Sequence, residues 1–573
     1  MTDLPNEKHW LISPKIPPQA AEALSAFTPV MRQLLFNRGY ATDAEARAYL
    51  RAETLFDPDP RQMTGILAAV ERIRAAIDHA GPIAIYGDYD VDGVSATALL
   101  VQAIRLLGGN VRGYIPNRFD EGYGLNKEAL SSLQADGVSL VITVDCGIRS
   151  PDEAVHARNI GLDLIITDHH QPADGDLPPA LVVINPKQSG DPYPDKDLAG
   201  VGVAYKLAQA LFTALRPAAA GAYPELDDLL DLVALGTVAD LAPLVGENRV
   251  LVRKGLQNLR QTKRQGLFSL AAVSDLPLAR ITATSIGYVL GPRLNAAGRL
   301  DSALAAFELL TTSDVRTAGE LAQQLNVQNR QRQEITRKIQ AEAEAMIQAD
   351  DPEANLLFAV HPDFNAGVVG LAAARLVETH YRPAVVGQIT EETTRCSCRS
   401  IPEFHITEAL DQCKDLLIRH GGHAAAAGFT VSNGNLIGLR RRLVAIASEQ
   451  LGGRDLRQTL IADVEIPLAD LKSELLKHLE SLQPTGYGNP EAVFVSRNVR
   501  VTSSRTVGAE ANHLKLVVTE GLGSFDAIGF RLGHLLPGLP PQVDLVYTFE
   551  TNEYNGRTTL QLNLKDVKPS TGA

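Results

Sequence analysis

Short apolar runs that alternate with helical segments limit the fold of this chain more than any other feature. The runs IAIYG, LVITV and DLIIT, at residues 83–87, 140–144 and 163–167, have the length and the β-branched content of buried strands. Helical segments lie between them, among others at about 93–107 and 126–135. Strands and helices that alternate at this spacing predict a parallel α/β sheet with helices on both faces.

Each of these three strands is followed by side chains that bind metal ions well. They are, in chain order, Asp90, Asp92, Asp145, His169 and His170. The carboxyl ends of parallel strands meet at one edge of a sheet, so we expect these side chains to lie close together. A further acid, Asp240, ends the apolar helical run LLDLVALGTVADLAPL, where a carboxylate without a cation would be costly.

Taken singly, each of these residues has a structural explanation. An aspartate after a strand is most often a helix N-cap or a turn residue, and an adjacent histidine pair is often structural. The set as a whole is different, because crowded carboxylates repel one another and a divalent cation removes that penalty. Carboxylate and imidazole ligands without a thiolate suit Mn²⁺ or Mg²⁺ and disfavour structural zinc. The sequence therefore predicts a centre for divalent cations.

Length and cysteine content narrow the class of protein. With 573 residues the chain is long enough for three or four domains, and its 4 cysteines form no CxxC pair. A disulfide framework is therefore not expected, and a reducing compartment is favoured. The N-terminal sequence has no apolar leader, and no run of about 18 apolar residues occurs. These features predict a cytoplasmic protein without membrane segments.

The charge balance is a weak guide to partners. Lys and Arg number 54 against 67 Asp and Glu, a net charge of −13, whereas nucleic-acid binders are often basic. A carboxylate-lined metal site adds negative charge, however, and a groove can still be basic locally. Residues 249–264 carry six basic side chains and no acid, so this run is either a solvated helix face or a local nucleic-acid contact.

Glycine patterns give no support for a nucleotide cofactor. The stretch from Gly200 to Tyr205, GVGVAY, matches half of a dinucleotide fingerprint, but Tyr205 replaces the third glycine and no strand precedes it. We interpret this stretch as the start of a helix. The chain has no Gly-Lys dipeptide and hence no Walker A loop, so ATP is not an expected ligand.

The rest of the sequence predicts further domains. Residues 308–348 are polar, with one glycine and no proline, which is typical of a single helix over most of this length. About five strand-like runs follow residue 458, the last two joined at Tyr554-Asn555-Gly556, and favour an oligonucleotide-binding (OB) barrel. The predicted order is a helical lead-in (1–75), a first α/β domain (76–307), a connecting long helix (308–350), a second α/β domain (351–457) and the barrel (458–573).

The motifs around these residues resemble those of a known family. DYDVDG, VDCG, TDHH and TVADLAPL are similar, in this order, to the four metal-site motifs of the DHH phosphoesterase family. PRLNAAGRLDSA, SCRS and GGHAAAAG, at residues 292–303, 397–400 and 421–428, resemble later motifs of the family, the last two those of its associated DHHA1 domain. YIPNRFDEGYGL at 114–125 and LQPTGYGNPEAVF at 482–494 resemble segments of family members that degrade single-stranded DNA. The resemblance covers essentially the whole chain.

The resemblance implies two sets of functional residues. The catalytic set is Asp90, Asp92, Asp145, His169, His170 and Asp240, of which all but His170 would bind metal. The DNA- or phosphate-binding set is Arg118, Arg299, Ser397, Arg399 and His423. Asp145 is implied to bridge two ions, and His170 to lie against the scissile phosphate. The second set has structural explanations too, such as a helix cap for Arg299 or a tight loop for His423.

This sequence departs from the family pattern at two places. The first motif commonly begins with histidine four residues before its first ligand aspartate, and here Tyr86 stands there. A tyrosine is a poor ligand for Mn²⁺ at neutral pH, so one of the two ions lacks a ligand that other members of the family supply. Cys396 and Cys398 stand where small residues are common, which predicts a site that is sensitive to oxidation.

The function implied by the resemblance is that of a single-stranded-DNA-specific 5′→3′ exonuclease. Such an enzyme is a metal-dependent hydrolase of DNA repair and recombination that releases 5′-mononucleotides with two Mn²⁺ or Mg²⁺ ions. Its two α/β domains would enclose a cleft too narrow for duplex DNA, while the barrel tracks the strand. The implied partners are single-stranded DNA with a 5′ end, a single-strand-binding protein and a helicase. The protein is expected to be a monomer that uses no ATP.

Two alternatives stay open on the sequence. One is an oligoribonuclease, cyclic-dinucleotide phosphodiesterase or pyrophosphatase of the same family, which would leave the barrel and the lead-in without a role. The other is a non-catalytic scaffold that binds single strands, although the expected ligand residues are all present in this chain.

Overall fold

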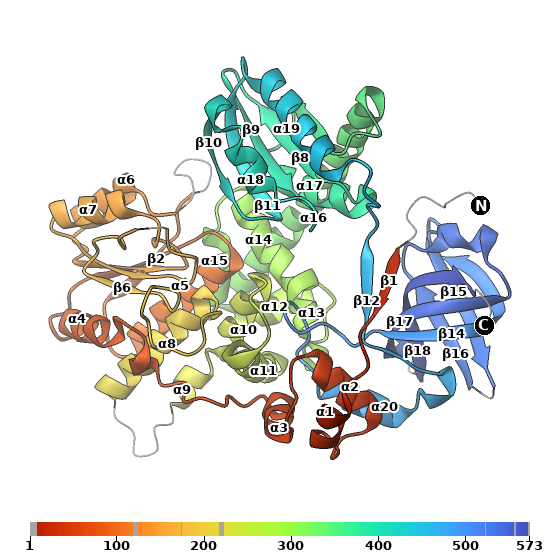
Figure 1. The fold of residues 1–573 in the computed structure, drawn as a ribbon. Helices are drawn as coiled ribbons and strands as arrows, with labels where there is room; N and C mark the ends of the chain where they lie inside the picture. Colours follow the sequence, from red (N-terminus) through yellow and green to blue (C-terminus); the bar gives the residue numbers. More distant parts are fainter. Residues whose placement is uncertain are drawn as a thin grey trace. The chain divides into compact units, whose positions relative to one another are not determined.

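The computed structural model describes residues 8–117, 124–173, 175–216, 223–521, 523–554 and 557–570. The chain forms two compact units. One comprises Trp10–Gln323 with Ile461–Ala573, and the other Met1–His9 with Gln324–Leu460. Figure 1 labels the elements along the chain. Among the described residues, no helix has both the length and the apolar character that crossing a membrane requires.

A parallel five-stranded sheet forms the first α/β part, in the order β3-β2-β4-β5-β6. Its strands are β2 (Ile83–Gly87), β3 (Val111–Tyr114), β4 (Leu140–Val144), β5 (Asp163–Thr167) and β6 (Val182–Ile184). Every residue of β2 and β4 is buried, because helices cover both faces of a parallel sheet and leave no polar side. The predicted sheet and its three acid-bearing strands are confirmed.

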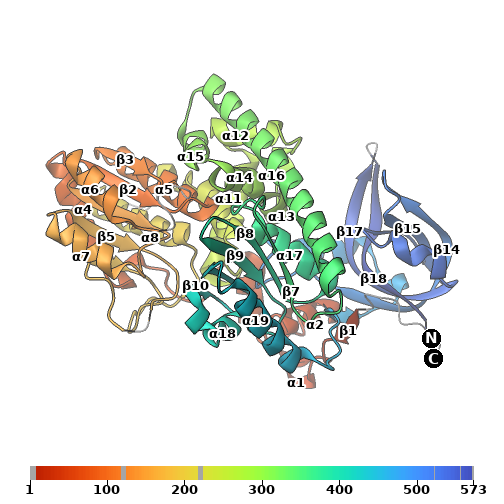
Figure 2. The same ribbon diagram turned by 90° about the horizontal axis from the view of Figure 1, so that it is seen from above.

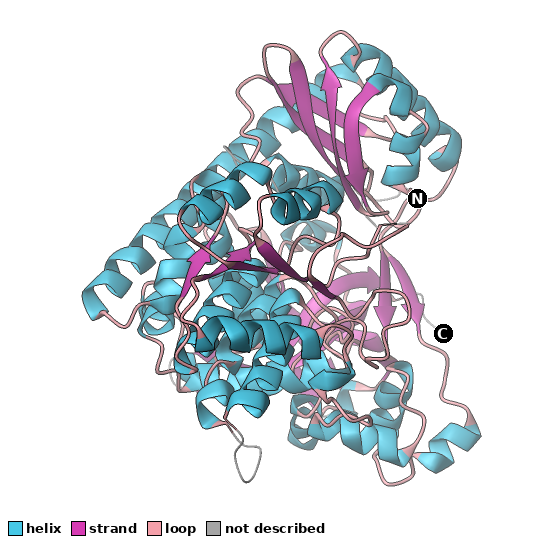
Figure 3. Ribbon diagram, turned by 90° about the vertical axis from the view of Figure 1, so that its left-hand side faces the viewer, coloured by secondary structure: helices cyan, strands magenta, loops and turns pink. Residues whose placement is uncertain are grey.

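Helices cover both faces of this sheet, as Figures 1 and 3 show. One face carries α4 (Ile66–Asp78), α5 (Val91–Leu106) and α8 (Gly200–Leu215), and the other α6 (Lys127–Ala135) and α7 (Pro151–Asn159). Ala84 and Tyr86 of β2 lie in one buried cluster with Leu130 of α6 and Ala154 of α7. The stretch from Gly200 to Tyr205 opens α8, which confirms its interpretation as a helix start.

Further helices follow α8 in the same unit. They are α9 (Pro224–Asp227), α10 (Leu230–Ala239), α11 (Gly246–Arg260), α12 (Gln265–Ala272), α13 (Ala283–Ser285), α14 (Gly291–Leu300) and α15 (Leu304–Thr311), with a π-helical turn, η3 (Ile286–Leu290), between α13 and α14. Most of residues 308–348 lie in the long helix α16 (Val315–Asp350), as predicted and as Figure 2 shows. The helix starts later than expected because Thr312 is extended and Asp314 accepts a hydrogen bond from the amide of Thr317 at 2.7 Å, as an N-cap does.

The other unit contains a mixed sheet with the order β10-β11-β9-β8-β7. Its elements are β7 (Leu357–His361), α17 (Val369–His380), β8 (Ala384–Ile389), β9 (Thr393–Arg399), α18 (Ile406–Asp411), β10 (Leu417–Gly422), β11 (Ala426–Ser432) and α19 (Leu436–Leu451). Alternate residues of β9 face opposite sides of the sheet. Cys396 and Cys398 are buried in a core with α18 and α19, so Ser397 and Arg399 lie on the opposite face.

A closed five-stranded barrel occupies the C-terminal region, as predicted. Its strands are β14 (Phe494–Val507), β15 (His513–Glu520), β16 (Gly523–Gly529), β18 (Arg557–Pro569) and β17 (Gln542–Tyr554), and pairing of β14 with β17 closes it. Strands β16 and β18 pair in parallel, and the other pairs in the barrel are antiparallel. Asn555 and Gly556 of the predicted turn lie outside the described residues. The elements before the barrel are β12 (Thr459–Ala462), which pairs with β1 (His9–Ile12), then β13 (Val464–Glu465) and α20 (Ser473–Glu480).

The helical lead-in shares a core with the barrel. Its helices are α1 (Pro18–Ala23), α2 (Pro29–Asn37) and α3 (Asp43–Arg51). Leu34 and Tyr49 lie in one buried cluster with Phe494 and Tyr547. Arg249, 2% exposed, donates hydrogen bonds to the carbonyl oxygens of residues 481–484 at 2.9–3.2 Å and to that of Tyr49 at 3.1 Å. The first residue of the basic run 249–264 is therefore a structural arginine and not a nucleic-acid contact.

Candidate metal centre

The predicted acids and histidines meet at the carboxyl ends of β2, β4 and β5. Nε2 of His169 lies 3.1 Å from Oδ1 of Asp145, and 3.8 Å from Oδ2 of both Asp92 and Asp240. The ligand atoms form three sets, and within each set all of the atoms lie within 4.8 Å of one another. The sets are Asp92, His169 and Asp240; Asp145, His169 and His170; and Asp88, Asp90 and Asp145. All six members of the predicted catalytic set are thus brought together.

Helix N-termini hold both aspartates of the first acidic loop. Oδ1 of Asp90 caps α5, since it accepts hydrogen bonds from the amides of Asp92 at 2.9 Å and Gly93 at 3.1 Å. The oxygens of Asp92 accept from the first amides of α8, at 2.7 Å from Gly200 and 2.9 Å from Val201. The positive ends of two helix dipoles therefore stabilise carboxylates that would otherwise repel one another.

Two positions beside these carboxylates require glycine. A Cβ on Gly200 would lie 2.7 Å from Cβ of Asp145, and a Cβ on Gly236 of α10 would lie 2.5 Å from Oδ1 of Asp92. Both separations are too short for real side chains, so a larger residue at either position would displace a carboxylate. The sequence did not predict this requirement for glycine. The pattern around Gly200 indicates only the start of a helix, and the approach to the carboxylates is visible only in the folded chain.

The loops after β4 and β5 fix Asp145 and His170. Asp145 has a left-handed backbone, φ 59°, which is costly for a residue other than glycine and is typically retained at functional sites. Asp168, 1% exposed, accepts hydrogen bonds from Nδ1 of His170 at 2.8 Å and from the amide of Ile148 at 2.9 Å. Asp168 therefore orients the ring of His170 toward the cluster.

Burial and mutual repulsion shift the pKa values of these groups. Burial, together with neighbouring carboxylates, raises the pKa of Asp92 and Asp145 well above the usual range and that of Asp240 to about 7. Burial also lowers the pKa of His169 to about 3, so its imidazole is neutral at pH 7. At His170 burial acts in the same direction, but the hydrogen bond to Asp168 and the surrounding carboxylates outweigh it and raise the pKa to about 9. Groups with such opposed shifts cluster at functional sites.

The donors fit a divalent cation. Oδ1 of Asp145 and Nε2 of His169 are buried, and neither makes a hydrogen bond with any described residue. A neutral imidazole nitrogen that faces three carboxylates is an arrangement that a cation stabilises, because the cation removes the repulsion among the acids. Several carboxylates with imidazole and no thiolate are ligands that suit Mn²⁺ and Mg²⁺.

Asp88 joins this cluster, although sequence reasoning did not select it. It is 3% exposed and lies in one set with Asp90 and Asp145; its position directly after β2 was the available signal. Tyr86 instead packs in the core on the α6 and α7 side of the sheet. Its hydroxyl donates to the carbonyl oxygen of Gly124 at 3.0 Å and accepts from Nδ2 of Asn126 at 3.1 Å. The additional acid of the centre is therefore Asp88, and Tyr86 is a core residue.

Helix α14 lies against the acidic loop. Oδ1 of Asn295 accepts a hydrogen bond from the amide of Val91 at 3.1 Å, and a Cβ on Gly298 would lie 2.8 Å from the carbonyl oxygen of Tyr89. Arg299, which is half-buried, belongs to the last turn of this helix. Through Asn295 and Gly298, α14 contacts the acidic loop of the metal centre. Arg299, a predicted phosphate-binding residue, therefore lies on a helix that touches the centre.

Ser397 and Arg399, in the other unit, face the start of α17. Nη1 of Arg399 donates to Oγ of Ser397 at 3.2 Å. A Cβ on Gly370, at the start of α17, would lie 2.8 Å from Oγ of Ser397 and 3.2 Å from Nη2 of Arg399. A guanidinium, a hydroxyl and the N-terminus of a twelve-residue helix therefore come together, a combination of donors that suits an anion.

Two members of the predicted phosphate-binding set remain. His423 is exposed between β10 and β11; its amide donates to the carbonyl oxygen of Ala426 at 2.8 Å, and its carbonyl oxygen accepts from Oγ1 of Thr407 at 2.8 Å. Arg118 lies outside the described residues. The roles of both stay predictions.

The cysteines of β9 are core residues. Cys396 and Cys398 lie in one buried cluster with Cys413, and burial raises the pKa of the Cys396 and Cys398 thiols. Only the thiolate reacts readily with oxidants, and these thiols face away from Ser397 and Arg399. The structure therefore argues against the predicted sensitivity of this site to oxidation.

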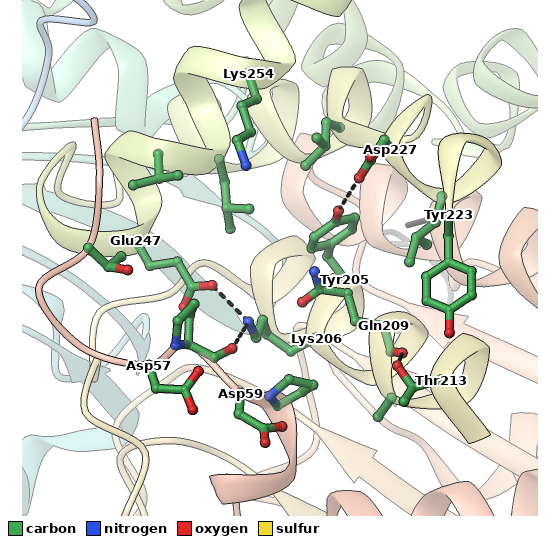
Figure 4. Close-up of a pocket in the computed structure, with 18 of the residues that line it drawn as sticks. Asp57, Asp59, Tyr205, Lys206, Gln209, Thr213, Tyr223, Asp227, Glu247 and Lys254 are labelled. Atoms are coloured by element: carbon green, nitrogen blue, oxygen red, sulfur yellow. Dashed lines mark hydrogen bonds and ion pairs between the residues drawn. The ribbon is translucent and has the colours of Figure 1, made fainter. Parts of the chain in front are cut away.

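A pocket of about 970 Å³ lies elsewhere in the unit of the metal centre (Figure 4). Nζ of Lys206 donates to Oε1 of Glu247 at 2.8 Å and to the carbonyl oxygen of Pro58, and the hydroxyl of Tyr205 donates to Oδ1 of Asp227 at 3.2 Å. None of the metal-centre residues lines this pocket. Because these polar groups satisfy one another, we interpret the pocket as a packing feature of the lead-in against α8 and α11.

Three family models match the chain in the order of its domains. The DHH family N-terminal domain matches residues 82–237, the DHHA1 domain residues 353–452 and the RecJ OB domain residues 462–566. The chain is 39% identical over 547 residues to the single-stranded-DNA-specific exonuclease RecJ of Bacillus subtilis, a match that covers 95% of this chain and 68% of that protein. Identity to the RecJ protein of Escherichia coli is 34% over 571 residues, or 96% of this chain and 98% of that protein. The chain belongs to the RecJ family.

Solved structures of RecJ proteins share this fold. The crystal structure of RecJ from Thermus thermophilus in complex with Mn²⁺ is 29% identical, with a TM-score of 0.84, and the match covers 98% of this chain and 80% of that one. The corresponding Mg²⁺ complex is 27% identical with a TM-score of 0.78, and the match covers 98% of this chain and 79% of that one. The predicted fold, with DHH, DHHA1 and OB domains, is confirmed. Both ions that the ligand set predicts occur in RecJ family structures.

Proposed function

We propose that this protein is a single-stranded-DNA-specific exonuclease that starts at a 5′ end and releases 5′-mononucleotides. The observation that carries the proposal is the convergence of Asp92, Asp145, His169 and Asp240 at one sheet edge in a chain of the RecJ family. Similarity to the RecJ exonucleases extends over the lead-in and the barrel, which the pyrophosphatase and cyclic-dinucleotide alternatives leave without a role. The buried, intact ligand set gives no support to a non-catalytic scaffold.

The chain's own residues divide the work at the centre. We assign two divalent cations, Mn²⁺ or Mg²⁺, to Asp90, Asp92, Asp145, His169 and Asp240, with Asp88 as a further acid. When bound, such ions supply Lewis-acid activation of water and stabilise negative charge on the reacting phosphate. Asp168 accepts a hydrogen bond from Nδ1 of His170, and this contact fixes the ring and raises the pKa of the imidazole. We propose that His170, oriented in this way, donates to an oxygen of the scissile phosphate as charge develops there.

We assign the 5′→3′ direction of digestion to hydrogen-bond donors in the DHHA1 domain. We propose that Ser397 and Arg399 bind the 5′ phosphate, supported by their contact with each other and by the helix N-terminus at Gly370. Arg118, Arg299 and His423 are proposed to bind the DNA backbone. An enzyme that recognises the strand by its 5′ phosphate begins at that end, so digestion runs 5′→3′.

The remaining domains are proposed to select and retain a single strand. The OB barrel would track the undigested part of the strand by stacking and charge, as OB folds do. In this proposal the protein is a cytoplasmic monomer that works in DNA repair and recombination beside a single-strand-binding protein and a helicase, without ATP.

A panel of substrates tests the proposed activity. The protein is incubated with Mn²⁺ and, separately, single-stranded DNA, duplex DNA, single-stranded RNA, a cyclic dinucleotide and pyrophosphate. We expect rapid release of mononucleotides from single-stranded DNA alone, and loss of this release in Asp92→Asn. Faster turnover of pyrophosphate or the cyclic dinucleotide would favour the alternative enzymes, and binding of single strands without hydrolysis would favour the scaffold.

A further inference from the structure

Tyr288 is the most exposed large aromatic side chain among the described residues, with 81% of its surface accessible. It occupies the middle of the π-helical turn η3, between the buried side chains of Ile286 and Leu290. A π-helical turn widens the helix and occurs frequently at functional sites. Figure 1 shows α13 and α14, the two helices that flank this turn. The turn therefore projects an aromatic ring into solvent from a backbone that is otherwise anchored.

The segment that carries Tyr288 is fastened to two parts of the metal centre. A Cβ on Gly291, the residue after η3, would lie 3.5 Å from Cβ of Ala239, which directly precedes Asp240. One turn further along, Asn295 accepts the hydrogen bond from the amide of Val91, between the two aspartates of the first loop. Tyr288 thus belongs to a segment that contacts both the acidic loop and the end of α10.

Leu241, next to Asp240 of the metal centre, is a second unusual apolar residue. It directly follows Asp240, is 66% exposed and has a left-handed backbone with φ 61°. The amide of Ala242 donates to the carbonyl oxygen of Thr237 at 3.2 Å, so Leu241 takes the place in the helix C-cap that glycine usually fills. An exposed leucine in this conformation is unfavourable for stability alone, since glycine would relieve the strain. Its presence indicates that an exposed apolar side chain has a role beside Asp240.

We infer that Tyr288, together with Leu241, forms a subsite for an unpaired nucleobase next to the scissile phosphate. The inference rests on the proposed function. In this inference a nucleotide whose phosphate lies at the carboxylates extends its base toward these two side chains, and an aromatic ring stacks on any base irrespective of sequence. Only an unpaired base that has left its own stack can offer its face. The subsite therefore adds to the preference for single strands without selecting a sequence.

A position scan with abasic nucleotides tests this subsite. Single-stranded, 5′-phosphorylated oligonucleotides carry one tetrahydrofuran residue at each of the first six positions in turn, and KM and kcat are measured with Mn²⁺. For the wild type we expect one position, or two adjacent ones, to raise KM about 5- to 150-fold, the range of one base–aromatic stack. Tyr288→Ala should raise KM on the intact strand by a similar factor and become insensitive to the abasic residue at that position. Tyr288→Phe should behave as the wild type, because it keeps the ring.

Two further variants separate a binding role from a structural one. Phe268→Ala removes another exposed aromatic side chain of the same unit, 55% exposed on α12, and should leave KM and the position profile unchanged. Leu241→Gly should raise the melting temperature, because it relieves the left-handed strain, and yet raise KM. A merely structural leucine would give the first change without the second.

The outcomes distinguish this inference from the proposed function. If the wild type degrades single-stranded DNA but Tyr288→Ala has an unchanged KM, or remains sensitive at every abasic position, the subsite is contradicted while the function stands. If the wild type neither binds nor degrades single strands, the proposed function fails and the subsite fails with it.

Discussion

Nε2 of His169 and Oδ1 of Asp145 lie 3.1 Å apart at the ends of two neighbouring parallel strands, β5 and β4. Burial holds the imidazole neutral and raises the pKa of the carboxyl group, so the two atoms compete for protons in the absence of metal. A divalent cation between them would replace that competition by ligation and release protons on binding. The pair therefore links the metal dependence of the protein to its pH dependence.

Replacing Asp145 by alanine should abolish nuclease activity and leave the fold intact. Its carboxylate faces both His169 and His170 and belongs to two of the ligand sets, so no other residue can take its place. We expect the initial rate on single-stranded DNA at saturating Mn²⁺ to fall at least about a hundredfold. Asp152→Ala, which removes an exposed acid from α7, is the matched control and should keep the full rate. A folded Asp145→Ala protein with more than about a tenth of the wild-type rate would contradict the assignment.

The stabilisation of the protein by Mn²⁺ should grow as the pH rises from 5 to 8. The folded-state pKa of Asp240 is about 7, above its unfolded value, so without metal its carboxyl group costs stability progressively as the pH rises from about 4 through 7. Asp92 and Asp145 act in the same direction, whereas His169, with its lowered pKa, opposes them below about pH 6.5. Bound metal reverses the penalty because it requires the deprotonated carboxylates.

Thermal unfolding in Mn²⁺ and in chelator, at pH 5, 6, 7 and 8, measures this linkage. The difference in melting temperature between the two conditions should increase with pH, and should increase less in Asp240→Asn. An equal difference at every pH would show that the carboxylates do not exchange protons for metal.

Arg399→Ala should erase most of the preference for a 5′-phosphorylated over a 5′-hydroxyl end. Loss of one charge-assisted contact corresponds to about 1.5–3 kcal/mol, a factor of about 10–150 in the ratio of kcat/KM for the two ends. Arg399→Lys should restore only part of this preference, since lysine keeps the charge but loses the two-pronged geometry. Arg395→Ala is the matched control, because Arg395 is exposed on the same strand and the same face. An unchanged ratio in Arg399→Ala would assign this arginine another role.

Arg249→Met should destabilise the protein by at least about 1–3 kcal/mol, the cost of one buried acceptor left without a donor, although the methylene groups are largely retained. The substitution leaves the carbonyl oxygens of residues 481–484 and of Tyr49 without their buried donor. Lys254→Met on the same helix removes an exposed charge and should change the urea midpoint little. Equal midpoints for the two variants would mean that water replaces the guanidinium.

The same contacts make truncation before residue 458 a poor test of the barrel, since it would remove the partners of Arg249 and of the lead-in.

Much of the metal centre could be predicted from the sequence because parallel strands obey a simple rule. The side chains that follow β2, β4 and β5 share one edge whatever the detailed packing, and Asp90, Asp145 and His169 need nothing else to meet. The barrel could also be predicted, because each of its five strands is a local pattern in the sequence after residue 458.

What could not be predicted depends on contacts between distant segments. Gly200 and Gly236 stand in ordinary helical sequence, and only their approach to Asp145 and Asp92 shows why neither can be larger. Arg249 is the first residue of a basic run that resembles a solvent-exposed or DNA-binding face. Its guanidinium instead donates to the carbonyl oxygens of residues 481–484, more than two hundred positions away.

The direction of digestion is the most direct test of the proposed function. Single-stranded oligonucleotides with the same sequence, labelled at the 5′ or at the 3′ end, are digested with Mn²⁺ and with chelator, and the labelled products are resolved over time. The proposal predicts immediate release of a labelled mononucleotide from the 5′-labelled strand, a progressively shortening ladder from the 3′-labelled strand, and no reaction in chelator. Release of the 3′ label first, or digestion that persists in chelator, would contradict it.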